Sequence, residues 1–133
     1  MPCSFDFDWK HRIIRCRLHG RVTDADLKEL YTTGYKLVFS TQPLASIVDG
    51  SEITSIEISP QAIGQLAKAA PVLPEPRQRR VIIAPSPEFY DVARMFQVQG
   101  GATRPILHVV RTQEEAFTAL AVQNLRFEPL DSR

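Results

Sequence analysis

The sequence predicts a single α/β domain with a mixed, mostly parallel sheet of about five strands, an N-terminal antiparallel hairpin and about four helices. Its 133 residues suit one hydrophobic core. The chain opens with two segments in which apolar and polar residues alternate, joined by a short turn. Apolar residues at helical spacing and short continuous apolar runs then follow each other along the chain. Because strands separated by helices pair in parallel through right-handed crossovers, this order predicts a sheet with helices on its faces.

The hairpin is predicted from residues 4–9 and 13–19. Apolar and polar residues alternate in the first segment, as in a strand with one buried face. The basic residues 10–12 form the turn, and Gly20 ends the second strand.

Two cysteines are too few for a disulfide scaffold. Pairing of the two apolar faces of the hairpin places Cys16 opposite Phe5 or Phe7, and Cys3 opposite Leu18 or beyond it. The cysteines would then not face each other, so we expect two reduced thiols.

Four helices are predicted from their N-terminal caps, because a serine or threonine precedes each helical apolar pattern. The first helix runs to about Phe39, and Gly34 weakens it. Two of the caps precede a proline, which suits the first helical position. The four capping residues are Thr23, Ser59, Ser86 and Thr112.

Three short apolar runs predict buried strands over residues 44–49, 81–84 and 106–110. The folded domain is expected to cover residues 1–122. The polar residues 123–133 are expected to form a mobile C-terminal tail.

The bulk properties favour a globular chain without a nucleic-acid partner. Hydrophobic residues make up 44% of the sequence, charged residues 23%, and the formal charge is only +1. No apolar run has the length of a membrane span, and Asp6 and Asp8 stand where a signal peptide would carry positive charge. We therefore expect a cytoplasmic protein.

The sequence contains no recognisable catalytic constellation. It has no nucleophile elbow, phosphate loop or dinucleotide fingerprint, and Gly100-Gly101 is interpreted as a turn. Its three histidines are scattered and no metal-ligand spacing occurs. We expect no enzyme activity, no cofactor and no metal.

The segment 70–80 holds three of the ten prolines and is predicted to be an extended surface loop. Val72 and Leu73 lie between these prolines. They either form a flap that touches a membrane or covers a pocket, or fold back onto the core, which we favour. If a pocket exists, its candidate lining residues are Tyr31, Tyr35, Leu73 and Phe96, although we favour an ordinary core position for each.

Arg77, Arg79 and Arg80 form a basic cluster where this loop meets the next strand. The cluster is either a solvated edge, which we favour, or a contact for an anion or a membrane headgroup. Aromatic residues are not interleaved with it, which argues against nucleic acid.

The element order and four segments resemble the SpoIIAA-like family, which is related in fold to the STAS domain of anti-sigma-factor antagonists and to CRAL-TRIO-type lipid carriers. The segments are IVDGSEITSIEIS (47–59), RRVIIAP (79–85), ARMFQ (93–97) and VVRTQEEAF (109–117). The resemblance covers nearly the whole chain. It implies a STAS-like α/β domain without catalysis or cofactor that acts as a regulatory or ligand-binding module.

The resemblance also implies a phosphoacceptor serine at a helix start, in the pattern Asp-Ser-Ser-Gly. Here the matching stretch is Glu57-Ile58-Ser59-Pro60, so Ile58 occupies the acceptor position and only Ser59 remains, shifted by one. Ser59 is first of all a helix cap, and a phosphate would be tolerated there electrostatically. We therefore keep it as the phosphoacceptor candidate.

The leading hypothesis is a non-enzymatic regulatory module that binds a protein partner or the membrane surface. The alternative is a carrier or sensor of a small apolar, lipid-like ligand, in which the first helix and the proline-rich loop open over a pocket. A peripheral membrane location stays open. A homodimer also stays open, because such a sheet leaves two free edges at which another chain can pair.

Overall fold

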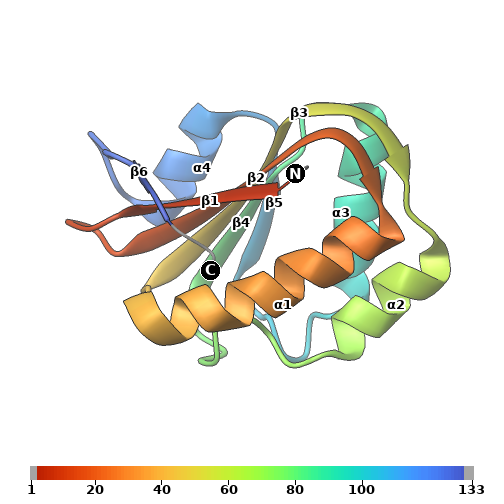
Figure 1. Ribbon diagram of the computed structural model, residues 1–133, viewed down its shortest axis with the longest axis horizontal. Helices are drawn as coiled ribbons and strands as arrows, with labels where there is room; N and C mark the ends of the chain where they lie inside the picture. The colour runs from red at the N-terminus through yellow and green to blue at the C-terminus, as the bar shows by residue number, and fades with distance from the viewer. Residues whose placement is uncertain (1–2, 131–133) are drawn as a thin grey trace.

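The computed structural model describes residues 3–130 and shows a six-stranded sheet in the order β5-β4-β3-β2-β1-β6, with four helices (Figure 1). The strands are β1 (Cys3–Asp8), β2 (Ile13–Thr23), β3 (Ala45–Glu57), β4 (Arg79–Ile83), β5 (Leu107–Val110) and β6 (Glu128–Pro129). The helices are α1 (Asp24–Thr41), α2 (Pro60–Lys68), α3 (Pro87–Gln99) and α4 (Gln113–Leu120).

Strand pairing confirms the predicted fold class. β1 and β2 are antiparallel, whereas β2, β3, β4 and β5 pair in parallel through crossover helices. The sheet has one strand more than the five or so predicted, because β6 pairs with β1 at its edge.

The helices cover both faces of the sheet (Figure 1). On one face, α1 and α3 pack on the inward side chains of β2, β4 and β5 through a core that includes Leu18, Leu30 and Phe89. On the other face, α4 packs on the alternate residues of β3 and β4 through Ala116 and Leu120. Residues that alternate along a strand point to opposite faces, so both faces of the central strands are buried.

All four predicted caps are present. In each, the side-chain oxygen of the capping residue accepts a hydrogen bond from the backbone three residues further on, at 3.1–3.4 Å. α1 continues past the expected end at Phe39 to Thr41. Gly34 has a packing role in it, because a Cβ there would lie 3.2 Å from Cγ1 of Val72 in the proline-rich loop.

β2 and β3 are longer than predicted. Gly20 does not end β2; it adopts a φ of 73° between two register shifts, and pairing with β3 continues to Glu57. Beyond Asp49, β3 pairs only with β2, because β4 has already ended. This two-stranded extension is half exposed, which explains why its polar sequence did not indicate a strand.

The prediction of a mobile tail over residues 123–133 is wrong for the part that ends at Leu130. β6 pairs with Asp6 and Phe7 of β1, and the backbone nitrogen of Arg126 donates to Oδ2 of Asp8 at 2.5 Å. The Phe127 ring lies 3.9 Å from the guanidinium carbon of Arg15. Residues 131–133 lie outside the described range.

Gly50 marks a close approach between β3 and α3, and Gly50→Ala is expected to destabilise the fold by about 1–3 kcal/mol. A Cβ there would lie 2.4 Å from Cε2 of Phe89 and 3.0 Å from the carbonyl oxygen of Ile83, so the strand or the helix must shift. Urea denaturation should show a lower midpoint. Gly101→Ala is the control, because its nearest neighbour would be at 3.5 Å; equal midpoints for the two variants would contradict this prediction.

Candidate functional site

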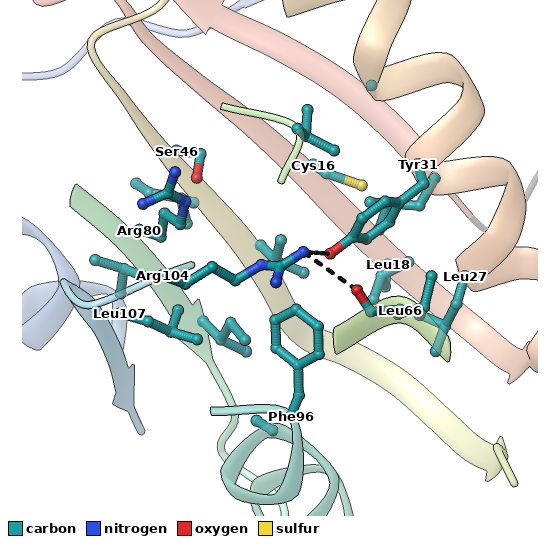
Figure 2. Close-up of a pocket in the computed structure, with 18 of the residues that line it drawn as sticks. Cys16, Leu18, Leu27, Tyr31, Ser46, Leu66, Arg80, Phe96, Arg104 and Leu107 are labelled. Atoms are coloured by element: carbon teal, nitrogen blue, oxygen red, sulfur yellow. Dashed lines mark hydrogen bonds between the residues drawn. The ribbon is translucent and has the colours of Figure 1, made fainter. Parts of the chain in front are cut away.

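A pocket of about 140 Å³ lies between the sheet and helices α1, α2 and α3 (Figure 2). Its walls are mostly aliphatic and aromatic, with a few polar side chains among them. Apolar walls with few polar groups are typical of small-molecule sites. The apolar walls include Phe5, Leu18, Leu27, Leu30, Val48, Ile63, Leu66, Ile82, Ala93 and Leu107, and the polar side chains are Cys16, Tyr31, Ser46, Arg80 and Arg104.

Of the four residues considered for a pocket, Tyr31, Leu73 and Phe96 line this one. Tyr35 does not line it; its side chain is 40% exposed and its hydroxyl donates to the carbonyl of Ala70. Leu73 is only 1% exposed, so the proline-rich loop folds back onto the core and is not an exposed apolar flap.

Arg104 is the most notable polar residue of the pocket, and sequence reasoning did not single it out. Its side chain is 3% exposed and reaches across the pocket to Tyr31, whose hydroxyl accepts from Nη2 at 3.0 Å (Figure 2). Its two terminal nitrogens also donate to the carbonyls of Leu66, Ala67 and Ala69 at 3.1–3.2 Å. These carbonyls end α2, where the helix dipole favours a cation.

Arg80 also points inward, unlike the solvated edge that the sequence suggested. It is 6% exposed, and its terminal nitrogens donate to four carbonyls of the proline-rich loop at 2.7–3.2 Å. Arg77 and Arg79 are exposed and border a separate, more open depression beside His11. The three arginines therefore do not share one surface, and an anion contact at Arg77 and Arg79 stays a prediction.

The polar groups of the pocket affect each other's ionisation. Burial raises the pKa of Tyr31 although the nearby Arg104 charge opposes this, so the phenol is neutral at physiological pH. Burial and the Arg104 charge both lower the pKa of Arg80. Among residues 3–130, no carboxylate lies within ion-pair distance of either guanidinium.

The two cysteines lie closer together than their strand register suggested. Cys3 pairs with Leu18 and Phe5 with Cys16, which is one of the registers predicted, but the sulfur atoms meet diagonally at 2.8 Å. The expectation that the cysteines would not face each other is therefore wrong, although both are free thiols. The hydrogen bond with Cys3 and burial raise the pKa of the Cys16 thiol well above its usual range.

We expect both cysteines to react slowly with a water-soluble maleimide at neutral pH in the folded protein. Both are buried, and the raised pKa keeps the Cys16 thiol protonated, whereas the thiolate is the reactive form. Intact-mass measurement should show little labelling until denaturant is added. Rapid labelling of the folded chain would contradict the burial of this pair.

Ser59 joins the first turns of two helices. As the cap of α2 it accepts from the backbone of Ala62 at 3.1 Å, while its own hydroxyl donates to Oδ2 of Asp24 and its backbone nitrogen to Oδ1, both at 2.7 Å. Asp24 opens α1. These bonds from the hydroxyl and the backbone N–H of Ser59 lower the pKa of Asp24.

Residues 3–130 contain neither a metal-binding cluster nor a membrane-spanning helix. No group of three or more histidine, cysteine or acidic side chains is arranged to hold a metal ion in this range. Within the same residues, no helix combines the length and apolar content needed to cross a membrane.

Comparison with known proteins gives a likeness in structure only. No protein-family model matches the chain, and no curated protein matches it. The solved structure of the anti-sigma factor antagonist SpoIIAA in its unphosphorylated form matches with a TM-score of 0.59 and 14% identity, over 92% of this chain and 99% of that one. The Bacillus cell fate determinant SpoIIAA in its phosphorylated form matches with a TM-score of 0.57 and 18% identity, over 89% of this chain and 98% of that one. The chain therefore has the fold of SpoIIAA, as the sequence resemblance implied.

Proposed function

We propose that this chain is a non-enzymatic regulatory module that acts by binding a protein partner, and that Ser59 is the residue through which its state changes. The observation that carries the proposal is the position of Ser59, which caps α2 and is hydrogen-bonded to Asp24 of α1. The likeness to SpoIIAA, solved in phosphorylated and unphosphorylated forms, supports it. A membrane surface in place of a protein partner stays a prediction.

Phosphorylation would remove one of the two hydrogen bonds that link the helices and weaken the other, which the backbone N–H of Ser59 donates to Asp24. The Ser59 hydroxyl donates to the Asp24 carboxylate, whereas a phosphate ester at that oxygen has no proton to donate and brings negative charge against the carboxylate. The N-terminus of α2 would still favour the phosphate through its free backbone N–H groups. The modification would therefore keep α2 and weaken its attachment to the first turn of α1, which Thr23 still caps.

Native mass spectrometry of protein purified from its own host tests this proposal. We expect a phosphate-sized addition on the wild-type chain that is absent from Ser59→Ala. Ser86→Ala is the matched control, because Ser86 also caps a helix before a proline, and its hydroxyl oxygen accepts from the backbone of Phe89. A phosphate that survives Ser59→Ala, or a wild-type chain that never carries one, would contradict the role of Ser59.

The second candidate function is a carrier or sensor of a small apolar ligand. The pocket of about 140 Å³ favours it, because its walls come from α1, α2, α3, the proline-rich loop and the sheet. A neutral aromatic probe such as benzamide should bind there and raise the melting temperature by mass action. Absence of any binding at millimolar concentration would count against this function and leave the first one untouched.

A further inference from the structure

We infer that the pocket beside Arg104 binds a small organic carboxylate with an apolar body, of the aryl or medium-chain type. The inference rests on the second proposed function and specifies the chemical class of its ligand. It depends on three features of the pocket: its size, its buried positive charge and its free hydrogen-bond donors.

The size of the pocket limits the apolar body of the ligand. An engineered apolar cavity of about 150 Å³ in another protein holds benzene. The pocket here has nearly the same volume, about 140 Å³, and its walls include Leu18, Leu30, Val48 and Ala93. An apolar body of about six carbon atoms therefore fits.

The charge of the pocket favours an anion. Arg80 and Arg104 are both buried, and neither has a carboxylate partner within residues 3–130. Backbone carbonyls satisfy their terminal nitrogens, and the end of α2 contributes only about half of an elementary negative charge. Because buried charge is costly unless it is compensated, a ligand carboxylate would supply the missing countercharge.

Donors remain available for that carboxylate. The Tyr31 hydroxyl accepts from Arg104 and donates to no acceptor among the described residues, and the same residues offer no acceptor to Nε of Arg80 or of Arg104. The neutral phenol retains its proton. A carboxylate beside Arg104 would accept from Tyr31, and charge-assisted bonds of this type are the strong ones.

Calorimetric titration with benzoate and its neutral isostere benzamide tests the inference. We expect benzoate to bind at least about tenfold more tightly, as one charge-assisted bond predicts. Tyr31→Phe should bring the two affinities closer together while it leaves the contacts of Arg104 with α2 in place. Ala93→Leu should abolish binding of both probes, because Ala93 is buried in the pocket wall.

The outcomes separate the inference from the function on which it rests. Equal affinities that Ala93→Leu abolishes would overturn the carboxylate class and retain the apolar pocket. Binding of neither probe would overturn both. Benzoate binding that survives Ala93→Leu would lie elsewhere, for example at the exposed Arg77 and Arg79, and would also overturn the inference.

Discussion

Arg104→Met is expected to lower the free energy of unfolding by about 3 kcal/mol. The guanidinium of Arg104 is buried and supplies donors to three carbonyls at the end of α2 and to the Tyr31 hydroxyl. Methionine fills a similar volume but leaves these buried acceptors without partners. The cation–π contact with Phe96, at 4.8 Å from the ring centroid, is lost as well.

The matched control is Arg94→Met on the exposed side of α3. Arg94 donates only to the Gln97 side chain among the described residues, so its loss should change stability by less than about 0.5 kcal/mol. Chemical denaturation of both variants measures the difference. Equal stabilities would show that Arg104 is not the residue that fixes the end of α2.

Phe7→Ala is expected to cost about 4 kcal/mol. The Phe7 side chain is fully buried beneath the second half of α1, in a cluster with Leu37, Val38 and Leu73. Its ring also meets Trp9 edge to face, with centroids 4.6 Å apart. Removal of the ring leaves a cavity between β1 and α1 that the rigid strand cannot close.

Phe39→Ala provides the control for the loss of a phenyl ring. Phe39 lies on α1 and is 82% exposed, so its removal should change stability by less than about 0.5 kcal/mol. The difference between the two urea midpoints isolates the effect of burial. A similar loss in both variants would contradict the packing described for Phe7.

The elements that the sequence predicted best are those with strong local signals. Thr23, Ser59, Ser86 and Thr112 each begin a helix because a single side chain satisfies a free backbone N–H, and this requires no tertiary information. The alternating apolar residues of the hairpin predicted its two strands and narrowed the register to two alternatives, one of which the structure has. In contrast, β6 has two residues and no periodicity, and only its pairing with β1 defines it.

The pocket was predicted less completely than the fold. Four lining residues were named, and Tyr31, Leu73 and Phe96 line the pocket whereas Tyr35 does not. Arg104 was not named, because it follows a glycine pair in a segment that resembles a solvated turn. Its burial depends on Leu66, Ala67 and Ala69, nearly forty residues earlier in the chain, and no local pattern records such a contact.

The link between Asp24 and Ser59 has a thermodynamic consequence. It joins the N-terminal ends of α1 and α2, and both helices also form walls of the pocket, through residues such as Leu27 and Leu66. Two events that alter the same pair of helices share a coupling free energy, and that energy is reciprocal. If modification of Ser59 weakens the affinity of the pocket for its ligand by some factor, occupancy of the pocket disfavours the modified form by the same factor. The chain would then combine two inputs, modification of Ser59 and occupancy of the pocket, through the same two helices.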